Sequence, residues 1–422
     1  MFLRKFLFIG FMFFLLSGCK SLQINKKITK ELNSNFYKNQ FTGLLVYNPV
    51  NNDTIIAYNA ERYFTPASNT KIITLYTALQ ILSDSIPAFK YSVKGDTIFL
   101  VGTGDPTFLH PYFEDSTALK KIEKYKKVQL QINNLSDYRY GPGWSWDDFD
   151  KHFNPERSSF PMYGNVVTIS KPDSLRCIPK ALTDEIQIAK SKINRVYNKN
   201  SFIYPEGRSK EVKIPMVIDS LLLTRLWDSI APNKVIINNS LPKLEHTAYS
   251  SIPLDSLLKR MMHKSDNFLA EQLLIVASST FSTNLSSYRM RQYILENQLN
   301  DLKQVPRWVD GSGLSRYNLF TPTSIVQILN KLYNELSQKR LFTIFPAGGV
   351  SGTLKNYFKG DPEPYIYAKS GTLGNNYSLS GYLLTKKGEV LIFSFMNNHF
   401  RTANTEIKRE MGSILEYLRD SY

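Results

Sequence analysis

Ser68 and Lys71 are the first residues in the chain whose types and spacing allow chemistry. They precede the apolar run 72–82, and Pro66 ahead of a run with apolar residues at helical spacing predicts a helix start. Ser68 then lies at the helix N-terminus with Lys71 one turn on, on the same face. A serine hydroxyl is a poor nucleophile until a base takes its proton, and a partly buried lysine with a lowered pKa can be that base. The helix N-terminus also places partial positive charge where an oxyanion would form.

The serine and lysine need partners, because most such spacings in proteins are solvated helix surface. One candidate is Ser265-Asp266-Asn267, which interrupts a helical pattern between residues 254–262 and 268–274. Its structural alternative is capping, since Ser265 or Asp266 suits the N-cap of the second helix. The other candidate is Lys369-Ser370-Gly371-Thr372, in the stretch 365–372 that has the pattern of a strand.

Residues 141–148 form a turn that carries two tryptophans and two carboxylates, Asp147 and Asp148. The turn is either a packed loop with solvated acids or one wall of a substrate cleft, and we expect Asp147 or Asp148 to contact the substrate. The five histidines show neither an H-E-x-x-H motif nor clustered Cys/His spacing, which argues against a zinc site. We expect no metal and no cofactor.

Short apolar runs at both ends of the chain predict the sheet that positions these residues. Residues 43–47 and 54–58 are separated by turn formers and predict a hairpin. Residues 365–372, 378–384 and 389–396 predict three more strands, joined by two turns. The expected fold is therefore α+β: one five-stranded antiparallel sheet with the first and last helices on one face and the serine-lysine helix on the other.

The middle of the chain differs in character from both ends. From about residue 91 to 244, short alternating runs lie among Pro, Gly, Asn and Ser, which predicts an inserted, strand-rich domain or pair of small domains. The catalytic domain is then discontinuous, over residues 41–90 and 245–422.

The N-terminus has the layout of a secretory signal, with a short basic start and an apolar run over residues 6–16 that is too short to span a membrane stably. Leu16-Ser17-Gly18-Cys19 resembles the bacterial lipobox, in which a peptidase cuts before the cysteine and the thiol carries diacylglycerol. We therefore expect a signal peptide at 1–18, lipidation of Cys19, and a tether over 19–40 that attaches the protein to a lipid membrane. A plain cleaved signal with an incidental cysteine is the alternative.

The composition is that of an ordinary globular protein, with 42% hydrophobic and 21% charged residues among 422. The net charge of +16 is spread along the chain without a basic arm or an RNA-binding signature, so we expect a solvated basic surface and no nucleic-acid partner. Cys19 and Cys177 are the only cysteines. Because Cys19 belongs to the export signal, we expect no disulfide and a lone thiol at Cys177.

The three motifs S-x-x-K, Ser-Asp-Asn and Lys-Ser-Gly-Thr, in that order, resemble the signature of penicillin-recognising serine enzymes, which are the penicillin-binding proteins and serine β-lactamases. Four further segments resemble the low-molecular-mass class C penicillin-binding proteins, D-alanyl-D-alanine carboxypeptidases and endopeptidases: 102–106, 143–148, 310–315 and 347–354. That family also carries a large insertion between its first and second motifs. The resemblance runs from about Phe41 to the C-terminus. Ser370 is a departure, since the family usually has threonine there, but both supply a hydroxyl.

The resemblance implies a role for each motif residue. Ser68 attacks the carbonyl between two D-alanines, Lys71 takes its proton, and Ser265 relays that proton to the leaving nitrogen. Asn267 bonds the substrate amide and Lys71, and Lys369 binds the terminal carboxylate.

The family likeness also implies an oxyanion hole, partners and a location. The backbone N–H groups of Ser68 and Thr372 form the hole, Gly371 belongs to the same substrate-binding segment, and the hydroxyls of Ser370 and Thr372 assist. The partners are peptidoglycan stem peptides and, as covalent inhibitors, β-lactam antibiotics. The location is the bacterial cell envelope. The lipid anchor expected at Cys19 is a second departure from the family, whose members are soluble in the periplasm, and because no acidic run follows Cys19 we expect the anchored protein to face the periplasm.

Two other functions are compatible with these motifs. A serine β-lactamase or DD-esterase shares them but usually lacks so long an insertion after the first helix. A catalytically silent peptidoglycan-binding lipoprotein would keep the fold, but it has no need of all five residues Ser68, Lys71, Ser265, Asn267 and Lys369.

Overall fold

The computed structural model describes residues 21–171, 174–231, 234–242 and 244–422. Its central sheet has five antiparallel strands in the order β13-β14-β15-β1-β2. The strands are β1 (Phe41–Asn48), β2 (Asp53–Tyr58), β13 (Ile366–Leu373), β14 (Asn376–Leu384) and β15 (Val390–Asn398). Because β1 pairs with both β2 and β15, the sheet joins the first and last parts of the chain. The predicted α+β fold is confirmed.

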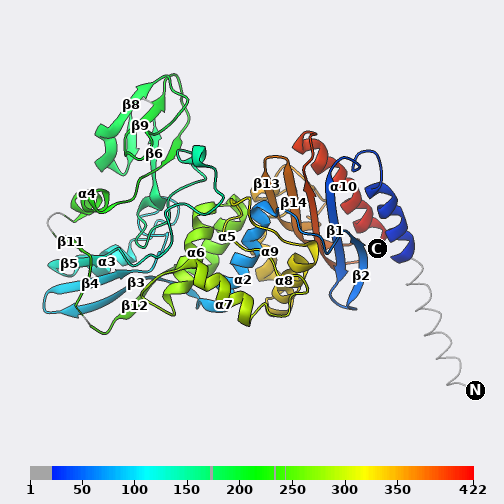
Figure 1. Cartoon of the computed structure of the whole chain (residues 1–422), viewed down its shortest axis with the longest axis horizontal. Coiled ribbons are helices and arrows are strands. Elements are labelled where there is room, and N and C mark those ends of the chain that lie inside the picture. The colour runs from blue at the N-terminus through cyan, green and yellow to red at the C-terminus, as the bar shows by residue number, and fades with distance from the viewer. Residues whose placement is uncertain (1–20, 172–173, 232–233, 243) are drawn as a thin grey trace, which may run out of the picture.

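One face of the sheet is covered by two helices, residues 21–32 and α10 (Asn404–Ser421), which lie side by side in Figure 1. Ile24, Ile28 and Leu32 recur every fourth residue and are buried in the same apolar cluster as α10. The first helix expected on this face is therefore present, but it lies at 21–32, within the segment 19–40 that was expected to be a tether, because it has an apolar stripe to bury. Cys19 and the expected signal peptide lie outside the described residues.

The other face of the sheet carries the helices that hold the site. They are α2 (Lys71–Ile81), α5 (Leu254–Lys264), α6 (Asn267–Ser279), α7 (Ser287–Asn297), α8 (Pro322–Glu335) and α9 (Gln338–Ile344). α6 lies at the centre of this group, and every residue from Phe268 to Ser279 is buried. Its sequence is largely apolar on all sides, which is the pattern of a helix surrounded by protein. α6 therefore offers a rigid support for the residues at its N-terminus.

The inserted part has an apolar core of its own and three small sheets. The largest has the order β11-β5-β4-β3-β12, formed by β3 (Ser85–Lys94), β4 (Thr97–Gly102), β5 (Lys127–Gln131), β11 (Val235–Asn238) and β12 (Thr247–Pro253). The others are β10-β6-β7, formed by β6 (Val166–Ser170), β7 (Arg176–Ile178) and β10 (Val212–Pro215), and the pair β8 (Ile186–Ala189) and β9 (Phe202–Pro205). The short helices are α3 (Thr117–Glu123) and α4 (Ser220–Ile230).

The insertion is wider than the 91–244 expected from composition. β3 and β12 pair with each other, one leading out of the catalytic part and the other back into it, so the insertion runs from Ser85 to Pro253. Ile86 and Ile252, near the ends of these strands, are buried in the apolar cluster of the catalytic helices, whereas Phe89 belongs to the core of the insertion, so both strands pass from one part to the other.

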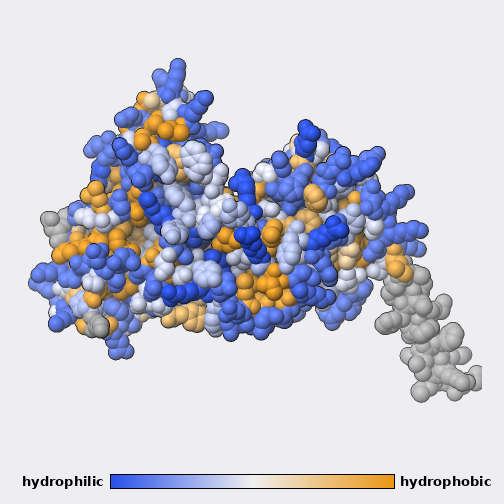
Figure 2. All heavy atoms as spheres, viewed as in Figure 1, coloured by the Kyte–Doolittle hydropathy of each residue, from blue (hydrophilic) through white to orange (hydrophobic). Residues whose placement is uncertain are grey.

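The inserted part extends from the catalytic part on the side opposite to the helix 21–32 and α10 (Figure 1). Figure 2 shows mainly hydrophilic side chains on the walls of the hollow between the two parts. Within the described residues, none of the helices combines the length and the apolar character needed to cross a membrane. Cys177 is a buried free thiol, as expected.

Candidate active site

Ser68 lies in a single 3₁₀ turn, Ala67–Thr70, that leads directly into α2. The turn is fixed to the central sheet, because Asn69 Nδ2 donates to the carbonyl of Lys369 on β13 at 2.9 Å. Ala67 adopts a left-handed conformation with φ of +48°, and Thr70 Oγ1 donates to its carbonyl at 2.9 Å. Ser68 remains partly exposed while its neighbours are buried. The nucleophile candidate is therefore held rigidly at the end of a helix with its hydroxyl accessible.

Lys71 is fully buried one turn beyond Ser68. Its Nζ lies 3.1 Å from Ser68 Oγ, 2.7 Å from Asn267 Oδ1 and 2.6 Å from the Ser312 carbonyl. Burial lowers the pKa of Lys71 from 10.5 to about 8, although nearby carboxylates, chiefly Asp310, act in the opposite direction. A lysine in this state is neutral for an appreciable fraction of the time near neutral pH and has the geometry of a base for the Ser68 hydroxyl.

Ser265 and Lys369 form a second hydroxyl–amine pair in the same site. Ser265 ends α5 in a left-handed conformation with φ of +53°, and Lys369 Nζ donates to its Oγ at 2.9 Å. Lys369 is fully buried on β13, and its pKa is well below the usual value because of burial and the charge of Lys71. Asp266 Oδ1 accepts from Leu269 N at 3.1 Å. The capping role considered for this segment thus belongs to Asp266, which leaves Ser265 free to face Lys369.

Asn267 connects the catalytic part to the insertion. Its Oδ1 accepts from Lys71, and its Nδ2 donates to the carbonyl of Phe153 at 2.9 Å. The bond between Asn267 and Lys71 agrees with the sequence-based expectation. The contact with Phe153 was not predicted, because every residue has a backbone carbonyl and the sequence does not show which one accepts a hydrogen bond.

β13 passes very close to Ser68 at Gly371. A Cβ built on Gly371 would lie 2.7 Å from the Pro66 carbonyl oxygen and 2.8 Å from Ser68 N. Thr372 follows and is exposed, while Ser370 Oγ lies 2.7 Å from Thr353 Oγ1. This approach brings the strand against the backbone N–H of Ser68, which is where an oxyanion hole needs it.

We expect Gly371→Ala to slow acylation of Ser68 by about ten- to a hundredfold, because the added methyl group must push β13 away from the Ser68 backbone. The rate of acylation by a β-lactam measures this effect. Gly374→Ala is the matched control, since a Cβ there meets nothing within 4 Å. Equal rates for both variants would show that the close approach does not matter for catalysis.

Asp147 and Asp148 lie outside this hydrogen-bonded group, on the turn that precedes it in sequence. Asp147 is exposed and Asp148 is half-buried. Burial and the charge of Asp147 raise the pKa of Asp148, while Arg316 opposes this shift. The turn is attached to the site through Trp144, whose Nε1 donates to Asp310 Oδ2 at 2.8 Å. The structure therefore places both acids beside the site, without a direct bond to its lysines.

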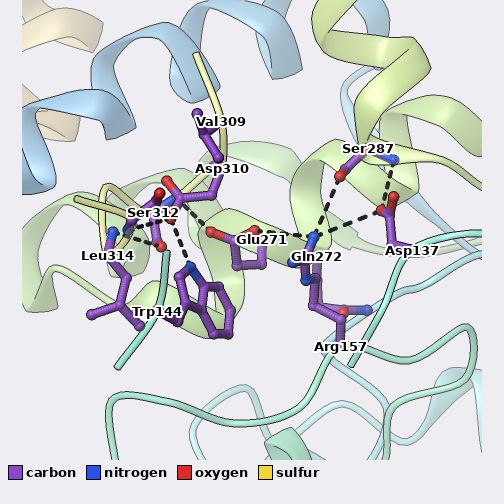
Figure 3. Close-up of polar contacts among 12 residues, drawn as sticks. Asp137, Trp144, Arg157, Glu271, Gln272, Ser287, Val309, Asp310, Ser312 and Leu314 are labelled. Atoms are coloured by element: carbon purple, nitrogen blue, oxygen red, sulfur yellow. Dashed lines mark hydrogen bonds and ion pairs between the residues drawn. The ribbon is translucent and has the colours of Figure 1, made fainter. Parts of the chain in front are cut away.

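Asp310 is a buried carboxylate that the sequence did not identify as a functional residue. Its oxygens accept four hydrogen bonds, from Trp144 Nε1 at 2.8 Å, Gly313 N at 2.8 Å, Ser315 N at 2.6 Å and Asn318 Nδ2 at 2.7 Å. Figure 3 shows this carboxylate between the indole of Trp144 and the loop that follows Asp310. Asp310 thus fixes the shape of the loop and ties it to the turn that contains Trp144.

The peptide between Ser312 and Gly313 connects Asp310 to Lys71. Its N–H donates to Asp310 and its carbonyl accepts from Lys71 Nζ. Hydrogen bonds in a chain polarise one another, so the carboxylate makes this carbonyl a stronger acceptor for the lysine. Gly313, with φ of +83°, is required here because any side chain would collide with the Ala67 carbonyl.

A second buried acid, Glu271 on α6, supports the same loop. Glu271 Oε1 accepts from Ser312 N at 2.7 Å, and Arg157 of the insertion lies 3.8 Å from Glu271 Oε2. Burial and the charge of Asp310 raise the pKa of Glu271, while Arg157 opposes the shift. Figure 3 shows how this group continues through Arg157 to Asp137. Its members come from separate segments with no shared motif, which is why the sequence did not predict the group.

Comparison with known proteins identifies the family of this chain. Residues 24–202 and 234–418 match the model of the D-Ala-D-Ala carboxypeptidase 3 (S13) family. The D-alanyl-D-alanine carboxypeptidase DacB of Haemophilus influenzae is 24% identical over 97% of this chain and 96% of its own. Penicillin-sensitive carboxypeptidase A of Dictyostelium discoideum is 22% identical over 86% of this chain and 83% of its own.

Solved structures show the same fold. The crystal structure of penicillin binding protein 4 (dacB) from Haemophilus influenzae superposes with a TM-score of 0.73 at 21% identity, over 93% of this chain and 98% of that one. The same protein complexed with a novel β-lactam gives a TM-score of 0.63 at 18% identity, over 93% and 98%. The likeness therefore includes the insertion as well as the catalytic part. The chain belongs to the D-Ala-D-Ala carboxypeptidase 3 (S13) family of serine peptidases.

Proposed function

We propose that the protein hydrolyses peptidoglycan stem peptides, as a D-alanyl-D-alanine carboxypeptidase and endopeptidase, through an acyl-enzyme on Ser68. The observation that carries this proposal is the buried Lys71, with its lowered pKa and its Nζ 3.1 Å from Ser68 Oγ. That arrangement provides a nucleophile and a base in one site.

The proton follows a closed path in this mechanism. Ser68 Oγ attacks the carbonyl carbon between the two D-alanines while Lys71 takes the hydroxyl proton and becomes an ammonium ion. When the C–N bond breaks, the leaving nitrogen takes the Ser265 hydroxyl proton, and Lys71 returns its proton to Ser265. The products are a Ser68 ester and a free amine, and water then hydrolyses the ester. Lys369, bonded to Ser265 at 2.9 Å, binds the terminal carboxylate of the substrate.

The backbone N–H groups of Ser68 and Thr372 stabilise the oxyanion. The close approach of Gly371 to Ser68 N supports this role, because it holds the strand and the turn at a fixed separation. Loss of one such donor typically lowers a rate by about a hundred- to a thousandfold. The hydroxyls of Ser370 and Thr372 assist in binding the carboxylate, and Asn267 bonds the substrate amide as well as Lys71.

Asp147 and Asp148 contact the stem peptide in this proposal. We expect the double variant Asp147→Asn/Asp148→Asn to lose about tenfold or more in kcat/KM on cross-linked muropeptides, because hydrogen bonds to charged groups contribute about 1.5–3 kcal/mol. Acylation by benzylpenicillin should be unchanged, since it does not use the stem peptide. Unchanged muropeptide kinetics would assign both residues to loop structure alone.

The protein acts in the bacterial cell envelope in this proposal, lipid-anchored through Cys19 and facing the periplasm. Support comes from the export signal with its lipobox in the sequence and from relatives named as D-alanyl-D-alanine carboxypeptidases. Radiolabelled palmitate incorporation in the native protein, and its loss in Cys19→Ser, tests the anchor.

A synthetic stem pentapeptide ending in D-Ala-D-Ala tests the reaction. We expect release of the terminal D-alanine by the native protein and none by Ser68→Ala. Rapid turnover of penicillin with no release of D-alanine would favour the β-lactamase alternative. Binding of peptidoglycan with neither activity would favour the silent lipoprotein.

A further inference from the structure

A cavity of about 290 Å³ lies where the insertion meets the start of α6. Ser265, Asp266 and Asn267 line the cavity from the catalytic part. The residues directly before and directly after these three belong to the same wall. The insertion supplies the opposite wall from four separate segments, represented by His110, Phe153, Tyr163 and Lys213. The reaction mechanism above uses Ser265 and Asn267 but leaves the rest of this cavity without a function.

The charge of the cavity is predominantly positive. Lys213, Arg260 and Lys264 line it, and the acid among the lining residues, Asp266, is engaged as the N-cap of α6. Lys213 also lies 3.6 Å from Glu211, but both side chains of that pair are exposed, and such pairs are weak. The lining therefore favours an anion.

The two histidines of the cavity add no charge near neutral pH. Burial lowers the pKa of His110 to about 4, and Arg260 and Lys213 contribute to the lowering. Burial also lowers the pKa of His152. The rings are thus available as neutral hydrogen-bonding groups, with Phe153 as an apolar surface beside them.

The position of Ser265 indicates on which side of the scissile bond this cavity lies. Ser265 gives its proton to the leaving nitrogen in the proposed mechanism, so the leaving group must lie against Ser265. A carboxypeptidase releases a single D-alanine, so its leaving group does not extend beyond Ser265. An endopeptidase releases a residue that belongs to a second peptide chain, and that chain must continue from Ser265 into neighbouring space.

We propose that this cavity binds a carboxylate-bearing peptide chain on the leaving side of the scissile bond, namely the second stem peptide of a cross-link. The inference rests on the proposed function and deepens it, because it assigns part of the insertion to the choice between cross-linked and monomeric substrates. Lys213, Arg260 and Lys264 bind the carboxylates of that chain, and the aromatic and proline residues contact its apolar atoms.

Calorimetric binding to Ser68→Ala tests this inference without any need for turnover. The two ligands are synthetic cross-linked peptides that are identical except that the carboxylates of the leaving chain are free in one and amidated in the other. We expect the free acid to bind about three- to tenfold more tightly, because each partly exposed ion pair contributes only a small amount. Adding Lys213→Gln and Arg260→Gln should reduce that preference to less than half, because only Lys264 of the three cations remains.

Lys126→Gln is the matched control, because Lys126 is an exposed lysine of the insertion that does not line the cavity. Should the triple variant fail to fold, Lys213→Gln in the Ser68→Ala protein is expected to reduce the preference by itself. Equal affinity of the Ser68→Ala protein for the two ligands, or a preference that is unchanged by Lys213→Gln and Arg260→Gln, would overturn the inference. Acylation of the native protein by benzylpenicillin reports separately on the proposed function.

Discussion

Lys71→Gln is expected to acylate Ser68 about a hundred- to ten-thousandfold more slowly than the native protein, because the variant has no base for the hydroxyl proton. Glutamine retains an NH₂ group that can donate to Asn267 Oδ1 and to the Ser312 carbonyl, so these hydrogen bonds are largely kept. The rate of adduct formation with a β-lactam measures the effect. Lys387→Gln, on an exposed turn, is the control and should react as fast as the native protein.

The same experiment at different pH values tests the pKa of Lys71. Only neutral Lys71 accepts a proton, so acylation should rise with pH through about 8 and then level off. At pH 7 a pKa of about 8 leaves about a tenth of the lysine neutral, against about one part in 3000 at the usual 10.5. Burial thus increases the reactive fraction a few hundredfold. A native rate that does not change between pH 6 and 8, or a Lys71→Gln rate that keeps the native pH dependence, would contradict this role.

Asp310→Asn is the second variant for which we expect a large effect. The negative charge of Asp310 raises the pKa of Lys71, so its removal lowers that pKa further. The rising limb of the pH profile should move to lower pH, and the plateau rate should fall because Lys71 becomes a weaker base. Glu271 and Asp266 still raise the pKa of Lys71 in this variant.

The asparagine variant should also be less stable. Whichever way its amide is turned, an NH₂ group replaces one carboxylate oxygen and faces two of the four donors around Asp310. Buried donors without a partner cost about 1–3 kcal/mol each, so the free energy of unfolding should fall by about 2–5 kcal/mol. Thermal or denaturant unfolding measures this change.

Trp144→Phe provides a test with the opposite sign. It removes one donor from the Asp310 carboxylate, so the charge of that carboxylate acts more strongly on Lys71 and raises its pKa. The rising limb of the pH profile of acylation should therefore move to higher pH. Trp308→Phe is the matched control, because Trp308 Nε1 donates to the backbone carbonyl of Asp310 at 2.7 Å rather than to its carboxylate. If the rising limb of the pH profile is at the native pH in both Asp310→Asn and Trp144→Phe, Asp310 has a structural role only.

The fold was predictable from the sequence where local patterns determine it. The strands of the central sheet are short apolar runs bounded by turn residues, and α10 has a clear helical period. A first helix was expected beside the last one, but its location at 21–32, within the expected tether, was not predicted because its apolar residues are few and lie among many polar ones. The edges of the insertion were missed because β3 and β12 cross from one part of the molecule to the other.

The candidate site was predictable to the extent that it consists of short motifs. Spacing alone placed Lys71 next to Ser68, and the order of the motifs brought Ser265, Asn267 and Lys369 into the same prediction. The contribution of Asp310 was not predictable, because it depends on a loop whose peptide groups face Lys71 on one side and a carboxylate on the other. Such an arrangement follows from tertiary packing rather than from any local pattern.

The most direct test of the central proposal is the intact mass of the soluble form, residues 20–422, after brief exposure to benzylpenicillin, followed by peptide mapping. We expect a mass increase of one penicillin per chain, located on the peptide that contains Ser68, and a slow decline over time. No adduct on folded protein, or an adduct on a different residue, would contradict the acyl-serine mechanism.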